Sequence, residues 1–112
     1  MPVKAVAKEI RTSPRKVRLV ADTVRGRRVD EALEILRFLP TPVAATVAKV
    51  VRSAAANAEN NLMLNPDGLR IVGIYADAGT PLRRVRASSR GRAGKVRKRS
   101  THITVIVDTE GA

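Results

Sequence analysis

The sequence predicts an α+β fold, with three helices packed on a small antiparallel three-stranded sheet and a long protruding basic β-hairpin. Three observations predict it. Three stretches with apolar residues at helical spacing follow one another before residue 62, and two strand-like stretches come after them. The segment between those strands, residues 83–99, has Arg or Lys at nine of its seventeen positions and no acidic residue. We treat residues 1–112 as a single domain and residues 80–101 as its extended hairpin, called the arm.

The N-terminal stretch Val3–Ile10 is predicted to be a short strand because its polar and apolar residues alternate. Lys4 and Lys8 fall on one face of this strand, and Val3, Ala5 and Ala7 fall on the other. We expect it to add a third strand to the sheet. The pattern leaves open which edge of the sheet it joins.

The first helix is predicted to start after Ser13, which can cap it, with Pro14 at the first helical position. Apolar residues recur at helical spacing from Arg15 to Arg25, and Gly26 can end the helix in a left-handed conformation. The basic residues that stay off this apolar stripe are Arg15, Lys16, Arg18 and Arg25.

A second helix is expected from Asp30 to about Leu39, and its acidic first turn suits the positive helix N-terminus. Thr41-Pro42 repeats the cap-plus-proline signal and opens the longest helix, which runs from Val43 to about Asn61. The small side chains of residues 53–58 permit a close approach to a sheet or helix. The sequence Asn-Pro-Asp-Gly at residues 65–68 predicts a turn into the next strand.

The arm is predicted to be a β-hairpin because strand-like stretches, Leu69–Ala78 and His102–Val107, flank it and Gly91 and Gly94 permit a turn. At about 3.3 Å per residue, roughly nine residues on each side carry its tip about 30 Å beyond the sheet. Like charges on neighbouring strands repel one another, so the arm requires a partner dense in negative charge. The alternative is a solvated flexible loop. We favour the hairpin because the charge is one-sided, rich in Arg and framed by strands.

The net charge of +12 is concentrated in residues 1–28 and in the arm, while the middle of the chain is close to neutral. Two such basic surfaces indicate a polyphosphate partner, most simply nucleic acid. The chain has no cysteine, which excludes disulfides, zinc knuckles and thiol catalysis. Its apolar runs are far shorter than the roughly 20 residues of a membrane span, so no membrane partner is expected.

The sequence shows no constellation of catalytic or metal-ligating residues. His102 is the only histidine, and a lone histidine at a strand start is more often structural or solvent-facing than catalytic. Asp77 and Asp108 lie on the strands that flank the arm and could approach each other, but an exposed charge or an Arg partner explains them better. The serines that lack an obvious activating base are Ser13, Ser88, Ser89 and Ser100. We predict no enzyme activity, no metal site and no cofactor.

We expect arginine to make most of the predicted contacts to nucleic acid, because 16 of the 22 basic residues are Arg. The planar guanidinium group of Arg binds phosphate bidentately and stacks on bases. Tyr75 could stack on a base, but a place in the core or on the sheet face is the favoured interpretation. Capping and solvent contact explain Asn57, Asn60 and Asn61 as well as any RNA contact does. The predicted RNA-binding residues are Lys4, Lys8, Arg11, Arg15, Lys16, Arg18, Arg25, Arg27, Arg28, Arg83, Arg84, Arg86, Lys95, Arg97, Lys98 and Arg99.

Four motifs occur in order along the chain: SPRKVRLV at residues 13–20, SAAANAENN at 53–61, GRA at 91–93 and KRSTHITV at 98–105. They resemble the large-subunit ribosomal protein twenty-two family, of bacterial type, and the resemblance runs from about residue 3 to residue 108. It implies a small α+β domain in the large ribosomal subunit of the cytoplasm, near the exit of the peptide tunnel. In that family the hairpin threads through ribosomal RNA, which the protein binds early in assembly.

The resemblance also implies the partners and the roles of the arm. The partners are large-subunit ribosomal RNA, neighbouring large-subunit ribosomal proteins and the nascent peptide in the exit tunnel. Bacterial members usually carry Pro-Arg-Ala where this chain has Ala87-Ser88-Ser89, which leaves open the exact tunnel-facing residues. The implied tunnel-lining tip is Ser88, Ser89, Arg90, Gly91, Arg92 and Ala93. The implied position of macrolide sensitivity is Leu82, Arg83 and Arg84.

The alternative is a freestanding basic protein that binds duplex nucleic acid or an anionic membrane surface. A membrane-bound amphipathic helix needs bulky apolar residues opposite its basic face. The apolar stripe of the first helix offers only Val and Ala, which weighs against the membrane.

Overall fold

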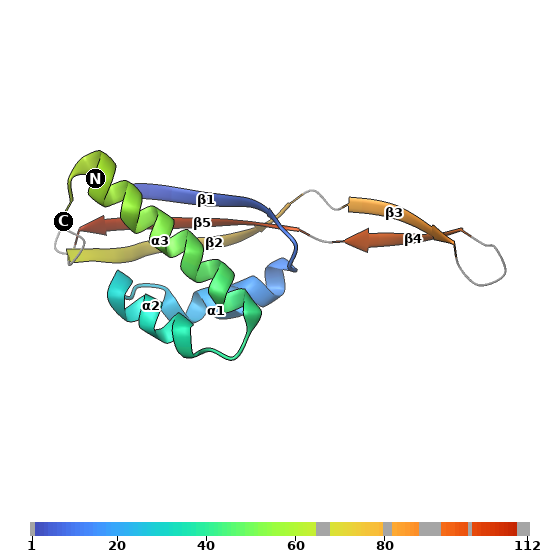
Figure 1. Cartoon of the computed structure of the whole chain (residues 1–112), viewed down its shortest axis with the longest axis horizontal. Coiled ribbons are helices and arrows are strands. Elements are labelled where there is room, and N and C mark those ends of the chain that lie inside the picture. Colours follow the sequence, from blue (N-terminus) through green and yellow to red (C-terminus); the bar gives the residue numbers. More distant parts are fainter. Residues whose placement is uncertain (1, 65–67, 80–81, 88–92, 99, 110–112) are drawn as a thin grey trace.

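The computed structural model describes residues 2–64, 68–79, 82–87, 93–98 and 100–109, and it confirms the predicted α+β fold (Figure 1). The elements in chain order are β1 (Val3–Ile10), α1 (Pro14–Val24), α2 (Val29–Phe38), α3 (Pro42–Leu62), β2 (Leu69–Ala78), β3 (Leu82–Ala87), β4 (Ala93–Lys98) and β5 (Thr101–Thr109). We call everything outside the arm the body. The molecule measures 62 × 27 × 17 Å, so it is elongated along the direction in which the arm leaves the body.

The body contains a three-stranded antiparallel sheet in which β5 is the central strand, with β1 on one side and β2 on the other. The first strand, whose edge the sequence left open, therefore joins β5 on the side away from β2. Along β1, Ala5 is buried while Lys4 and Lys8 are exposed, so the predicted alternation is confirmed.

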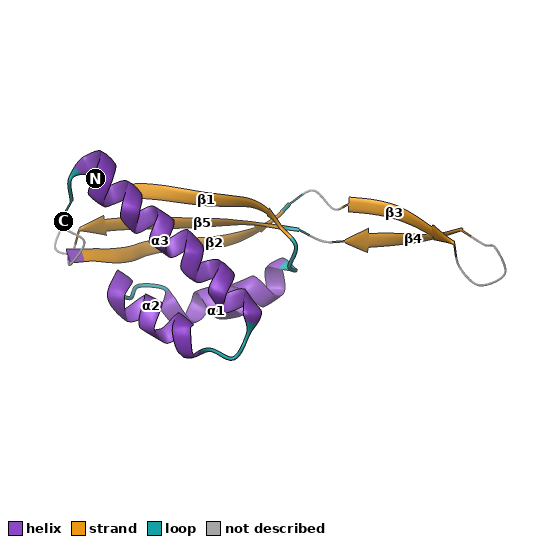
Figure 2. Ribbon diagram, viewed as in Figure 1, coloured by secondary structure: helices purple, strands orange, loops and turns teal. Residues whose placement is uncertain are grey.

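The three helices cover one face of this sheet (Figure 2). α1 packs against β2, α3 packs against β1 and β5, and α2 packs on the other two helices. In α3 the apolar residues Val47, Val50, Val51, Ala54 and Ala58 recur at helical spacing and are buried, and the small Ala54 and Ala58 let the helix approach the sheet closely. The fully buried sheet residues that face the helices are Leu69, Ile71, Ile74, Ile103, Val105 and Val107.

The helix ends follow the predicted signals with one exception. Thr41 caps α3, because its hydroxyl oxygen accepts a hydrogen bond from the Val43 N–H at 3.4 Å, and Gly26 follows α1 with φ at +79°. Ser13 stands at the N-cap of α1 as predicted, but its side chain makes no capping hydrogen bond. Its backbone carbonyl accepts from the Lys16 N–H at 3.1 Å and occupies the donor that the hydroxyl would have used. Residues 65–67 of the predicted turn lie outside the described residues.

The arm is a separate two-stranded sheet rather than an unbroken extension of β2 and β5. β3 and β4 pair antiparallel, from Leu82 opposite Lys98 to Ala87 opposite Ala93. Pro81 stands between β2 and β3 in the sequence, and a proline has no N–H to donate to a continuous ladder.

Asp77 and Asp108 do not meet, so the possible approach of these two carboxylates is ruled out. Asp77 lies opposite His102, and Asp108 lies opposite Arg70. On β5, His102, which lies opposite Asp77, is six residues away from Asp108, a distance of about 20 Å. The antiparallel register separates them, and no local sequence pattern encodes that register.

Candidate nucleic-acid interface

The cations of β1 and of the turn after it form the first part of the candidate interface. Lys4, Lys8 and Arg11 are all exposed. The inward face of β1 packs under α3, so Lys4 and Lys8 project from the face that the helices leave open. Lys4 lies opposite Ile106 rather than opposite an acidic residue. Both lysines therefore add positive charge to that face.

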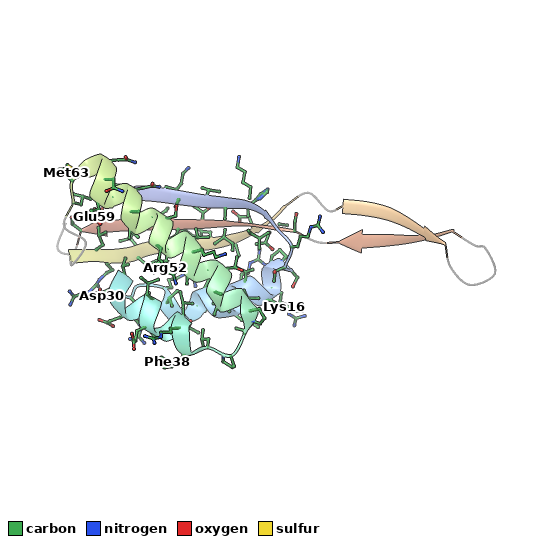
Figure 3. The ribbon with its side chains drawn as sticks, viewed as in Figure 1. Lys16, Asp30, Phe38, Arg52, Glu59 and Met63 are labelled. Atoms are coloured by element: carbon green, nitrogen blue, oxygen red, sulfur yellow. The ribbon has the colours of Figure 1, made fainter. Side chains whose placement is uncertain are left out.

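The start of α1 supplies a second group of exposed cations, Arg15 and Lys16. Figure 3 shows Lys16 at the end of the body nearest the arm. Leu19 is one turn further along α1 and is 68% exposed. Residues three and four positions apart are neighbours on a helix surface, so this leucine adjoins both cations. The sequence analysis did not single out Leu19, although its position off the buried stripe was the available signal.

Arg18 and Arg25 are exposed, yet the fold engages both guanidinium groups. Arg18 Nε donates to the Ala76 carbonyl at 3.1 Å, and Arg25 Nη2 donates to the Ile74 carbonyl at 2.9 Å. β2 is an edge strand, and its outward carbonyls need partners other than a neighbouring strand. Arg25 also pairs with Asp22 on its own helix. The two arginines therefore bind α1 to the edge of the sheet, a structural role that the sequence analysis missed.

The loop after α1 is held against β2 by backbone hydrogen bonds. Gly26 N–H donates to the Ile71 carbonyl at 3.2 Å, and Ile71 N–H donates to the Arg27 carbonyl at 2.9 Å. The side chain of Arg27 lies 3.9 Å from Glu31, and both side chains are about half exposed. A surface pair of this kind is weak, so Arg27 can exchange it for a phosphate. Arg28, also predicted to bind RNA, is half-buried and less accessible.

In the arm the structure describes the backbone of β3 and β4. The pairing places Arg83 directly opposite Arg97, and like charges in that arrangement destabilise an antiparallel pair. Residues 88–92 of the predicted tip and Arg99 lie outside the described residues. The predicted site residues on these two strands are Leu82, Arg83, Arg84, Arg86, Ala93, Lys95, Arg97 and Lys98.

Buried polar groups fasten the base of the arm to the body. Ser100 and Thr101 are 4% and 0% exposed, and Thr101 Oγ1 donates to the Thr12 carbonyl between β1 and α1. Gly79 N–H donates to the Ser100 carbonyl at 2.9 Å. A Cβ on Gly79 would lie 2.5 Å from Ser100 Oγ and 3.2 Å from the ring of His102, so any other residue here would force the Ser100 side chain to shift. The sequence analysis missed this cluster.

A group of exposed acidic residues lies on α2, in a different part of the body. Asp30 and Glu34 are exposed on α2, and together with Arg37 and Arg52 they line a groove of about 460 Å³ between α2 and α3. Figure 3 shows Asp30 at the end of the body away from the arm, opposite to the end that carries Lys16. The exposed carboxylates of α2 therefore make that helix surface unfavourable for a polyphosphate.

The remaining titratable groups give no catalytic arrangement among the described residues. No cluster of three or more His, Cys, Asp or Glu in those ranges is placed to hold a metal ion. A hydrogen bond from the Thr109 backbone N–H, 2.8 Å from Oδ1, lowers the pKa of Asp108 below its ordinary value. Within the described ranges, no helix has the length and apolar character of a membrane span.

The chain matches the family model described as "Ribosomal protein L22p/L17e" over residues 5–108. Several similar proteins carry the name "Large ribosomal subunit protein uL22". That of one Dehalococcoides mccartyi strain is 52% identical over 107 residues, covering 96% of this chain and 98% of the relative. That of Pelotomaculum thermopropionicum is 55% identical over 107 residues, covering 96% and 95%. That of a Roseiflexus strain is 53% identical over 108 residues, covering 96% of each chain.

Proposed function

Because the chain belongs to the ribosomal protein L22p/L17e family, we propose that it is a structural, non-catalytic component of the large ribosomal subunit. In this role it binds ribosomal RNA, aids its assembly and lines part of the nascent-peptide exit tunnel with its hairpin tip. The arm is the observation that carries RNA binding. It is a protruding two-stranded ribbon that holds Arg83 opposite Arg97, and such a ribbon is stable among closely packed phosphates rather than in water.

The described cations divide into direct contacts and supporting charges. Arg18 and Arg25 are engaged by β2 carbonyls and chiefly add to the positive field. Arg28 is half-buried and belongs with them. The exposed body cations that we assign to phosphates are Lys4, Lys8, Arg11, Arg15, Lys16 and Arg27. In the arm we assign the same role to Arg83, Arg84, Arg86, Lys95, Arg97, Lys98 and Arg99.

The tunnel assignment rests on the family. The proposed tip is Ser88, Ser89, Arg90, Gly91, Arg92 and Ala93, and the proposed macrolide-linked position is Leu82, Arg83 and Arg84. The partners that follow are large-subunit ribosomal RNA, neighbouring proteins of that subunit and the nascent peptide, in the cytoplasm. The tip acts by its shape in the tunnel, while the strands behind it act by their charge.

Sedimentation of the native protein tests membership of the subunit. We expect it to remain with the large subunit through a high-salt wash. A predominantly free soluble pool would instead support a freestanding nucleic-acid binder.

Salt dependence tests the role of the arm on purified protein and transcribed large-subunit RNA. Each phosphate contact contributes roughly 0.7 to 0.9 to the slope of log affinity against log salt. Replacing Arg97, Lys98 and Arg99 with Gln should therefore lower the slope by about two to three units. The matched control replaces three cations of α2 and α3, Arg37, Lys49 and Arg52, and should leave the slope unchanged. Equal slopes in the two triple variants would contradict the assignment of the arm.

A further inference from the structure

The face of the sheet that the helices do not cover, which we call the outer sheet face, carries an exposed apolar patch. Val6, Val72 and Tyr75 are 43%, 54% and 50% exposed, which is unusual for three large apolar side chains on one small sheet. Val6 on β1 lies opposite Thr104 on β5, and Thr104 lies opposite Tyr75 on β2. This row spans two strand spacings, roughly 10 Å. Val6 and Tyr75 therefore lie in one row across the sheet, on either side of Thr104.

Tyr75 rests on a glycine of its own strand. A Cβ on Gly73 would lie 3.0 Å from both Cε2 and Oη of Tyr75, so the phenol end of the ring occupies the space that any other side chain would take. Gly73 is buried as a result, while Tyr75 stays half exposed. The strand thus supports an aromatic ring on the outer sheet face instead of enclosing it in the core.

The charges around this patch favour an anionic partner. Asp108 lies opposite Arg70 and Asp77 lies opposite His102, so neither of the acidic residues that β2 and β5 place on this face lies opposite Lys4. Lys4 and Lys8 are exposed on β1, on either side of Val6 and on the same face. The positive charge of β1 is therefore not matched by acids across the sheet.

We propose that the outer sheet face binds an unpaired segment of ribosomal RNA, with one base stacked on Tyr75 and the adjoining phosphates next to Lys4 and Lys8. This inference rests on the proposed function and adds a contact distinct from the arm. The flat face of a base can stack on an exposed aromatic ring and cover the apolar side chains beside it. Only an unpaired base is free to do so, because the bases of a duplex are stacked on one another. The flanking lysines favour RNA over an apolar protein surface, and β2 and β5 lead from this face directly to the arm.

The composition of the chain allows a direct test, because Tyr75 is its only tyrosine and it has no tryptophan. Emission excited in the tyrosine band therefore comes from Tyr75 alone, and stacking on a base shortens the lifetime of that emission. Titrating the full chain with octauridylate should shorten the lifetime, and a twelve-pair RNA duplex should leave it nearly unchanged. Binding itself is followed independently by the anisotropy of a labelled oligonucleotide.

Two double variants separate the outer sheet face from general charge. Lys4→Gln with Lys8→Gln should move the midpoint of the lifetime titration about 25-fold higher at 0.1 M salt. Each phosphate contact to a single strand contributes roughly 0.7 to the slope of log affinity against log salt. Losing two contacts therefore costs about 1.4 log units of affinity at 0.1 M salt relative to 1 M salt, which is about 25-fold. Lys49→Gln with Arg52→Gln removes the same charge from the exposed surface of α3, on the helical side, and should move the midpoint less than about twofold.

Three outcomes would overturn the inference. One is bound octauridylate with an unchanged Tyr75 lifetime, and another is equal shortening by the duplex. The third is a lifetime that changes with protein concentration alone, which would assign the face to a second copy of the chain. All three leave membership of the large subunit intact. Conversely, a protein that shows the lifetime change but never sediments with the subunit would refute the proposed function and keep the RNA contact.

Discussion

The buried hydroxyl at the base of the arm gives the sharpest test of how the arm is attached. Thr101 is fully buried, and its Oγ1 donates to the Thr12 carbonyl. Thr101→Val keeps the shape of the side chain but leaves that acceptor without its donor, at a cost of about 1–3 kcal/mol. For a domain of about this size each kcal/mol lowers Tm by roughly 4–8 °C. A loss of about 2 kcal/mol therefore lowers Tm by roughly 8–16 °C.

The matched control is Thr104→Val, three residues further along β5. Thr104 is half-buried on the outer sheet face, so the same chemical change there should alter Tm by only a few degrees. Thermal unfolding followed by circular dichroism compares the two variants. Amide exchange adds a local measurement, because the Gly79 N–H bonded to Ser100 should exchange faster in Thr101→Val alone. If both variants melt together, the hydroxyl does not hold the base of the arm and the reasoning fails.

Two further predictions concern α1 and the tip. Arg18→Met should lower the free energy of unfolding in urea by about 1 kcal/mol, because the Ala76 carbonyl loses its donor. Arg15→Met on the exposed side of α1 should change it little. Equal losses in the two variants would refute the role of Arg18 in binding α1 to the edge strand β2. Deleting Ser88 and Ser89 removes no charge, so it should leave the salt slope of RNA binding unchanged. Because the deletion changes the shape of the tip, it should alter the response of ribosomes to macrolides. A changed slope with a normal drug response would contradict the roles assigned to the tip and the strands.

The helices were predictable because their signals are local. Pro14 and Pro42 stand at the first position of α1 and α3, and the apolar stripe of α3 needs no information beyond its own spacing. The same holds for β1, where alternation alone placed Lys4 and Lys8 on the exposed face. Each of these features depends on residues within a few turns or one strand.

The three side-chain hydrogen bonds that sequence analysis missed depend on distant contacts, whereas the exposed Leu19 had a local signal in its position off the buried stripe of α1. Arg18 and Arg25 bond to carbonyls 58 and 49 positions away, and Thr101 bonds to a carbonyl 89 positions away. An exposed arginine on a helix has the same local pattern whether it faces solvent or the edge of a sheet. The division of the predicted cations into structural and accessible ones therefore required the sheet order, which places β2 at an edge beside α1.

The strand order of the sheet also explains how the body supports the arm in the proposed role. A two-stranded ribbon is marginal in water, and the pairing of Arg83 with Arg97 weakens it further. The central strand β5 leads to the arm through the buried Thr101, so the base of the arm is held by the core before any RNA is bound. Lys16 lies at the arm end of the body and Asp30 at the other end (Figure 3). The exposed cations at the start of α1 therefore add positive charge beside the base of the arm, where a polyphosphate bound to the arm would meet them.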